Sequence, residues 1–293
     1  MQDSAAAFTL IFCAALLLGA LIKLYLNGRQ VRHVAQHRRQ VPEAFAQAVT
    51  LSAHQKAADY TLAKLRLSNL ELSLSAAVLL CWTLLGGLDA LNQALATTLA
   101  GWHPLVLQVA LVASFALIGG LVDLPLSLYA TFKLEARFGF NKMSLGLWLS
   151  DLLKSTLLGA LIGLPVVALI LWLMGSAGPQ WWLWAWGAWM GVNLLALVLY
   201  PTLIAPLFNK FQPLEDEALK TRVTALMIRC GFSAKGLFVM DGSRRSAHAN
   251  AYFTGFGAAK RVVFYDTLLA QLNPAEVDEI GRASCRERVY SNV

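Results

Sequence analysis

Charged residues are scarce in this chain. Asp, Glu, Lys and Arg together make up 14% of its 293 residues, whereas soluble domains carry about 25%. Hydrophobic residues make up 57%, and the apolar runs are too long for a buried core helix. This composition excludes an ordinary soluble domain and predicts an integral membrane protein.

Paired cysteines are also missing. Cys13, Cys81, Cys230 and Cys285 show no C-x-x-C or other paired spacing. The sequence therefore predicts neither a disulfide framework nor a cysteine metal site.

One His pair has helical spacing but lacks the residue that would make it catalytic. His33 and His37 stand one turn apart, yet no Glu follows the first His, and the surrounding stretch is basic. A general base is therefore absent, and the local charge repels a cation. We interpret the pair as part of a basic juxtamembrane helix near anionic headgroups rather than as a zinc site.

Five apolar segments are long enough to cross a bilayer. They lie roughly at Ala5–Leu26, Leu70–Leu88, Leu105–Thr131, Leu145–Met174 and Trp181–Leu203. An amphipathic cytoplasmic helix over Glu43–Leu67 is expected to lead into the second segment, and Asp89–Pro104 is expected to be a loop. Residues 1–206 are thus predicted to form a mainly α-helical membrane domain with about five transmembrane helices.

The distribution of positive charge predicts the orientation of these spans. The net charge is +7, and Lys and Arg lie in the loops after the first, third and fifth spans but not after the second and fourth. The N-terminus is therefore expected outside, with the basic loops and everything after Pro206 in the cytoplasm. The charge indicates membrane orientation rather than nucleic-acid binding. The chain is rich in Ala and Leu and has few intervening loops, which suggests a protein of the bacterial inner membrane.

Three charged residues lie in or beside apolar spans, namely Asp123, Asp151 and Lys154. Such charges tend to pair or to face a cavity, although a position at the membrane interface explains the last two equally well. Pro125 and Pro165 inside spans raise the alternative of a channel or transporter, but the chain shows no internal repeat of the kind that transporters carry.

The polar residues 207–278 are predicted to begin an α+β domain on the cytoplasmic side. An amphipathic helix over Glu215–Cys230 is expected to end at Gly231, because Gly suits a helix C-cap. The expected strands are Leu237–Met240, Ala251–Thr254 and Val262–Tyr265, with the glycine-rich connection Gly255–Lys260 between the last two. A further helix is expected to start at Asn273, where Asn-Pro-Ala-Glu has the composition of a helix N-terminus.

The last residues, 279–293, have no hydrophobic periodicity. Glu279–Val289 can be written in codons that match a common sequencing-adapter oligonucleotide read in frame. We interpret this segment as an adapter scar and exclude it from fold reasoning. The alternative is an ordinary polar C-terminal tail.

Three segments together resemble the CAAX prenyl protease 1 family of membrane zinc metalloendopeptidases. They are Leu134–Ser144, Ile204–Asp216 and Val239–Leu269. The similarity extends from the first span to about Asp278. It implies that the polar domain is the start of a zincin-like peptidase domain.

The resemblance also implies a zinc site that this sequence lacks. In the family, two His of an H-E-x-x-H helix and a later Glu bind zinc, and the Glu within the motif polarises the attacking water. The motif is expected just after Ile280, on the helix that starts at Asn273, and is absent. We therefore assign no catalytic or metal-binding residue, and we expect zinc in an intact family member but not in this chain.

The resemblance implies a peptide-binding edge strand over His248–Gly255, to which an extended substrate adds through main-chain hydrogen bonds. The candidate substrate-binding residues are Asn250, Ala251 and Tyr252, with His248 lining the cleft. The alternatives are a turn role for Asn250, a sheet aromatic in Tyr252 and a local hydrogen-bonding role for His248.

Two arginines precede this strand. Arg244 and Arg245 could bind a peptide carboxylate, because a guanidinium offers two parallel donors. A solvated basic turn is the favoured interpretation.

The sequence is consistent with two functions. The first is a membrane zinc endopeptidase that cleaves peptides, prenylated CAAX proteins or membrane proteins, of which this chain is a fragment without the metal site. The second is a catalytically inactive membrane protein that binds extended peptides by strand addition. Both have the lipid bilayer and a peptide or membrane-protein substrate as partners, and neither involves nucleic acid.

Overall fold

The computed structural model describes residues 2–229, 236–254, 261–271 and 276. The chain divides into two compact units, Met1–Phe138 and Gly139–Val293. Among these described residues, five helical segments are long and apolar enough to cross a membrane, which confirms the predicted fold class. Four predicted features lie outside the described residues. They are the C-cap Gly231, the connection Gly255–Lys260, the helix starting at Asn273 and the tail 279–293.

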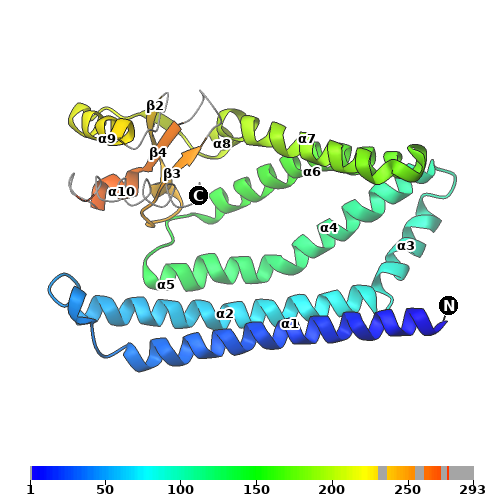
Figure 1. Ribbon diagram of the computed structural model, residues 1–293, viewed down its shortest axis with the longest axis horizontal. Helices are drawn as coiled ribbons and strands as arrows, with labels where there is room; N and C mark the ends of the chain where they lie inside the picture. Colours follow the sequence, from blue (N-terminus) through cyan, green and yellow to red (C-terminus); the bar gives the residue numbers. More distant parts are fainter. Residues whose placement is uncertain (1, 230–235, 255–260, 272–275, 277–293) are drawn as a thin grey trace. The chain divides into compact units, whose positions relative to one another are not determined.

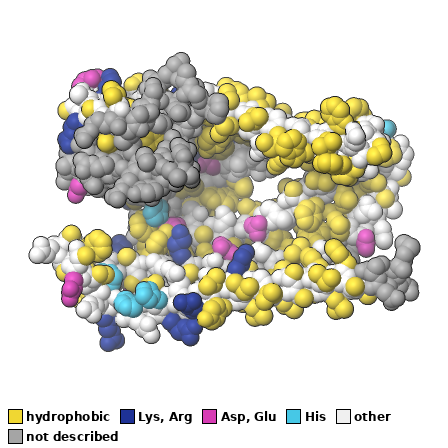
Figure 2. All heavy atoms as spheres, in the orientation of Figure 1, with side chains coloured by type: hydrophobic (Ala, Val, Ile, Leu, Met, Phe, Trp, Pro, Cys, Tyr) yellow, Lys and Arg dark blue, Asp and Glu magenta, His cyan; other side chains and the backbone are white. Residues whose placement is uncertain are grey.

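The first unit is entirely helical among its described residues. Its elements are α1 (Gln2–His37), the short 3-10 turn η1 (Glu43–Phe45), α2 (Leu51–Thr83), α3 (Gly87–Thr98), α4 (Pro104–Tyr129), the π-helix η2 (Ala130–Glu135) and α5 (Ala136–Phe138). The helices α1 and α2 lie side by side (Figure 1). Figure 2 shows hydrophobic side chains over the N-terminal part of α1 and basic and His side chains near the α1–α2 connection.

Two predictions in this unit were wrong in detail. The expected helix Glu43–Leu67 begins only at Leu51, where the Thr50 hydroxyl caps it by accepting from the Ala53 N–H at 3.2 Å, and it continues without a break to Thr83. The expected loop Asp89–Pro104 contains most of α3. The chain breaks between α2 and α3 because Gly86 takes a left-handed conformation with φ of 77°, which glycine adopts without strain.

The connection between α1 and α2 is held by an ion pair. The Arg38 guanidinium donates from Nε and Nη2 to the two carboxylate oxygens of Asp59 at 2.7 and 2.8 Å. Farther along, the side-chain amide of Asn27 donates to Asn69 at 2.7 Å. Both pairs join α1 to α2, so the two helices are fixed at two levels.

The second unit begins with two membrane-type helices and ends in a small sheet. Its helices are α6 (Leu145–Ser176), the 3-10 turn η3 (Gly178–Gln180), α7 (Trp181–Leu199), the π-helix η4 (Tyr200–Ile204), α8 (Ala205–Phe208), α9 (Glu217–Arg229), the 3-10 turn η5 (Gly242–Arg244) and α10 (Asp266–Gln271). Its strands are β1 (Phe211–Pro213), β2 (Gly236–Met240), β3 (Ala251–Thr254) and β4 (Arg261–Tyr265). The three predicted strands are confirmed to within a residue, whereas β1 was not predicted.

The sheet has the order β1-β2-β4-β3. The strand β1 is antiparallel to β2, β2 is parallel to β4, and β3 is antiparallel to β4. Val262, Val263 and Phe264 of β4 are all buried, as expected for a strand covered on both faces.

The core of the sheet domain lies between the sheet and α9. The buried side chains Leu219, Val223 and Met227 of α9 share one face and pack with those of the strands. Asp216 caps the helix by accepting from the Leu219 N–H at 2.9 Å. The predicted amphipathic helix is therefore confirmed, with its start two residues later.

A partly buried arginine joins the membrane helices of this unit to the sheet. Arg245 Nε and Nη2 donate to the two Asp151 carboxylate oxygens at 2.8 and 3.0 Å. Its Nη1 donates to Asn209 Oδ1 at 2.8 Å, and Nη2 also donates to the Phe208 carbonyl at 2.6 Å. The two paired side chains are 19% and 16% exposed. One guanidinium thus ties the start of α6 to the end of α8 and to the turn before β3.

We expect Arg245→Met to lower the free energy of unfolding by about 2–4 kcal/mol, because it leaves the Asp151 carboxylate uncompensated in a mostly buried position. The change can be measured by thermal unfolding of the full chain in detergent.

The adjacent Arg244→Met is the matched control. Arg244 is 48% exposed and its contact with Asp241 is longer, at 3.3 Å, so we expect a loss below about 1 kcal/mol. Equal losses in the two variants would show that the Arg245 contacts add no special stability.

Candidate functional site

The strand β3 forms one margin of the described sheet and pairs on one side with β4. The Tyr265 N–H donates to the Asn250 carbonyl at 3.0 Å. Hydrogen-bonded and non-hydrogen-bonded pairs alternate along an antiparallel ladder. The main-chain groups of Tyr252 and Thr254 therefore face β4, and those of Ala251 and Phe253 point away from it.

Asn250 stands at the start of this margin and is exposed. Its Oδ1 accepts the outward-pointing Ala251 N–H at 2.8 Å. An N–H needs an acceptor, so this contact also fixes which side-chain atom is the oxygen. The Nδ2 donors have no partner among the described residues. Asn250 therefore combines the turn role that was the alternative with an available donor at the edge.

His248 lies in the segment that leads into β3. Its ring stacks on Phe140 with centroids 4.1 Å apart, and its carbonyl accepts from the Thr267 hydroxyl at 2.9 Å. The preceding Ala247 N–H donates to the Phe140 carbonyl at 2.9 Å. These contacts give His248 a local structural role and fix the approach to β3.

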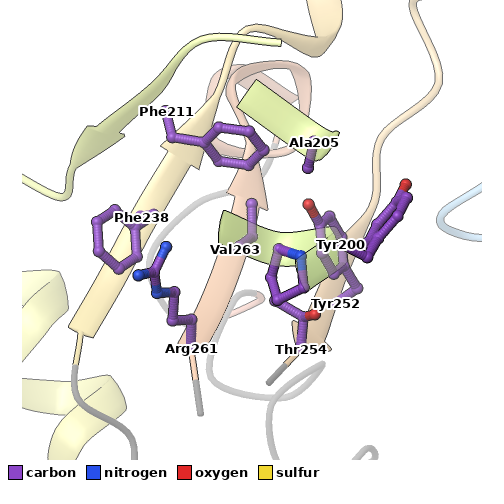
Figure 3. Close-up of a pocket in the computed structure, with 9 residues that line it drawn as sticks. Tyr200, Ala205, Phe211, Phe238, Tyr252, Thr254, Arg261 and Val263 are labelled. Atoms are coloured by element: carbon purple, nitrogen blue, oxygen red, sulfur yellow. The ribbon is translucent and has the colours of Figure 1, made fainter. Parts of the chain in front are cut away.

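Tyr252 points to the face of the sheet opposite α9. The register places Phe238, Val263 and Tyr252 in one row across β2, β4 and β3. Figure 3 shows Phe211 and Phe238 on one side of Val263 and the two tyrosines on the other. The cavity between them is lined by Tyr200, Pro201, Ala205, Phe211, Phe238, Tyr252, Thr254, Arg261 and Val263.

This cavity is too small for a peptide. Its volume is about 10 Å³, which is room for roughly one water molecule. The Tyr252 hydroxyl lies 3.9 Å from the Met240 sulfur, and burial raises the pKa of Tyr252 to about 12. The ring of Tyr252 therefore anchors β3 to the sheet. The main-chain groups of its neighbours Ala251 and Phe253 point away from β4.

The two arginines before β3 have separate roles. The donors of Arg245 contact Asp151, Asn209 and the Phe208 carbonyl. Arg244 remains on an exposed turn, as the favoured interpretation had it. Sequence reasoning noted Asp151 as an intramembrane charge but did not identify its partner, which lies 94 residues away in the chain.

No group of three or more His, Cys, Asp or Glu is close enough to hold a metal ion among the described residues. The printed sequence contains no H-E-x-x-H. The described residues therefore do not form a zinc site.

Comparison with known proteins gives consistent matches along the chain. A family model described as CAAX prenyl protease N-terminal, five membrane helices, matches residues 30–210. A model described as Peptidase family M48 matches residues 213–280.

Individual relatives support the same grouping. The chain is 38% identical over 213 residues to the CAAX prenyl protease 1 homolog of Oryza sativa subsp. japonica, covering 71% of this chain and 48% of that protein. It is 46% identical over 162 residues to CAAX prenyl protease 1 of Saccharomyces cerevisiae, covering 55% and 35%. The crystal structure of Ste24p from S. mikatae matches with a TM-score of 0.81 at 31% identity, over 89% of this chain and 61% of that chain. The chain thus spans about half or less of the length of these two curated relatives.

We expect Tyr252 to ionise near pH 12 rather than near 10. Because the neutral phenol is favoured in the folded protein, its contribution to stability is complete below pH 10 and is lost as the pH rises toward 12. Near-ultraviolet absorbance of phenolate can be followed during titration of the full chain and of Tyr252→Phe, and the difference curve isolates this residue. A midpoint near pH 10 in the difference curve would mean that the ring is solvated.

Proposed function

Because this chain belongs to the CAAX prenyl protease family, we propose that it is the membrane-embedded front part of a zinc metalloendopeptidase. The substrates would be peptides, prenylated CAAX-type proteins or other membrane proteins, presented from the cytoplasmic side. Family membership favours this function over that of an inactive peptide-binding protein. The observation that carries the substrate-binding part of the proposal is the outward-facing main chain of β3.

The zinc ion would be held by parts of the longer protein that lie outside these residues. Bound there, it would activate the water that attacks the scissile carbonyl. The described residues do not form a site for it. We propose that the chain is a fragment of the longer protein, that residues 1–206 and 207–278 are its two domains, and that residues 279–293 are the adapter scar.

The proposed binding mode is strand addition. A peptide lying antiparallel or parallel to β3 would meet the outer side of the strand, where the Ala251 carbonyl points away from β4 and the Ala251 N–H is already bonded to Asn250 Oδ1. The affinity would come from these main-chain hydrogen bonds, and pockets for alternate side chains would add selectivity. Tyr252 and the stacked His248 would act indirectly, because their contacts hold the strand and its approach in place.

Asn250 has a specific role in this mode. While its Oδ1 occupies the Ala251 N–H, its Nδ2 can donate to a carbonyl of the incoming peptide. The side chain therefore covers the first edge donor in the free protein and offers a donor of its own in the complex. A single hydrogen bond of this kind contributes about 1 kcal/mol.

The cellular location follows from the same premise. The chain is a multi-pass membrane protein by its five candidate spans. We propose that the N-terminus is outside and the sheet domain cytoplasmic, as the distribution of Lys and Arg predicts. The relatives compared above are eukaryotic and give no support to a bacterial inner membrane.

We expect Asn250→Asp to weaken binding of an extended peptide about fivefold. Asp keeps the acceptor for the Ala251 N–H but removes the donor to the peptide, and the loss corresponds to roughly 1 kcal/mol. The measurement is fluorescence anisotropy of a labelled Val- and Thr-rich peptide with the full chain in detergent.

Two controls accompany this test. Gln212→Glu makes the same amide-to-carboxylate change on β1 at the other margin of the sheet, and we expect it to leave binding unchanged. A peptide N-methylated at alternate residues should bind at least about tenfold more weakly. If Asn250→Asp binds like the parent chain, Asn250 only holds its own strand. If the N-methylated peptide binds equally well, strand addition itself is wrong.

A further inference from the structure

A second concave site lies in the first unit, between α2 and the end of α4. Its volume is about 680 Å³, which is within the range of about 300–1,000 Å³ typical of ligand pockets. It is lined by Ala63, Arg66, Leu67, Leu70, Pro125, Leu126, Tyr129, Lys133, Leu134, Arg137 and Phe138. We call it the α2–α4 groove.

One end of the α2–α4 groove is strongly basic. Arg66, Lys133 and Arg137 all line it and are exposed. Within the part of the chain that the structure describes, none of the three forms an ion pair. Three cations and no carboxylate line the groove, and such a lining favours an anion.

The nearby carboxylates are already engaged. Asp59 accepts from Nε and Nη2 of Arg38. Glu135 accepts from the Tyr60 hydroxyl at 2.6 Å. Neither acid lines the groove. Asp59 interacts electrostatically with Arg137 as well as with Arg38, so its counter-charge is shared between the two cations.

The rest of the groove is lined by apolar side chains. Along both helices, the apolar part of the span lies on the same side of the three cations. Leu70 lies one turn beyond Arg66 toward the apolar C-terminal half of α2. Pro125 and Leu126 lie about 10–12 Å before Lys133, within the apolar part of α4, at a rise of about 1.5 Å per residue. The site thus has a cationic end at the polar end of each helix and an apolar end toward the middle of the span.

The backbone at this groove is unusual. Lys133 and Leu134 belong to the π-helix η2, which interrupts the helix that runs from Pro104 to Phe138. Single π-helical turns within α-helices are rare and occur frequently at functional sites. Leu134 and Phe138 are buried, so the floor of the groove is packed while its cations remain accessible.

We propose that the α2–α4 groove binds an anionic glycerophospholipid. The headgroup phosphate lies among Arg66, Lys133 and Arg137, where guanidinium groups donate in pairs to phosphate oxygens. The acyl chains lie along Leu67, Leu70 and Leu126. Basic pockets between membrane helices are suited to anionic headgroups, and the apolar half selects a lipid over a soluble phosphate. The proposal is independent of peptide binding at β3.

Native mass spectrometry of the full chain can test the site, with mixed micelles of phosphatidylinositol and phosphatidylcholine as the probe. We expect the parent chain to retain phosphatidylinositol in preference. The combined variant Arg66→Gln, Lys133→Gln, Arg137→Gln should bind it at least about tenfold more weakly. If that variant fails to fold, the single changes Arg66→Gln and Lys133→Gln replace it, each with an expected loss of about threefold.

A second triple variant controls for general electrostatic attraction. Arg29→Gln, Arg32→Gln and Arg39→Gln remove the same charge from exposed positions on and just after α1. We expect retention within about twofold of the parent chain. Equal losses in both triples would overturn the proposal in favour of diffuse attraction. Equally tight binding of glycerophosphoinositol, which lacks acyl chains, would show that the groove takes a soluble phosphate instead of a lipid.

Discussion

The ion pair between Arg245 and Asp151 is the contact on which the second unit depends. A carboxylate near the start of a membrane-type helix is costly unless it is paired. Here its partner comes from the turn before β3 and also contacts Asn209 and the carbonyl of Phe208, where the chain leaves α8. The main chain of the same turn continues the connection, because the Arg245 carbonyl accepts from the Lys142 N–H at 3.1 Å. A single charged cluster thereby sets where the sheet domain starts relative to the helices of its own unit.

This cluster also constrains the position at which β3 starts. Between Arg245 and Asn250 the chain is held by the segment before α6 and by Thr267 at the start of α10. Few backbone groups in this approach are left to move independently. A strand offered to an extended peptide benefits from such fixing, since less conformational freedom is lost on binding.

The sequence predicted the parts of the fold that local chemistry determines. Five apolar runs identified the membrane helices, and short strand-like runs bounded by turn residues placed β2, β3 and β4 to within a residue. The helix α3 was missed because its sequence lacks long apolar runs and follows a turn glycine. The strand β1 was missed because three residues carry too little pattern, and only its pairing with β2 defines it.

In the candidate site, too, local features could be predicted from the sequence and long-range contacts could not. The edge position of the segment before Thr254 was implied by family resemblance, but the contact between Asn250 Oδ1 and Ala251 N–H could not be read from spacing. Tyr252 points to the face of the sheet opposite α9 because of its register with Val263, which the sequence alone does not determine. Arg245 was assigned to a solvated turn because its partner is distant in the chain and no local pattern reports such a pair.

The separation between the two members of the central ion pair has a consequence for biosynthesis. They lie 94 residues apart, and chains are synthesised at about 5–20 residues per second. For roughly 5–20 s the carboxylate of Asp151 therefore exists before its counter-ion has been made. During that interval the carboxylate of the newly inserted α6 has no ionic partner within the chain and must be solvated by water. The final seating of α6 is consequently a late event, completed only when the polar domain emerges from the ribosome.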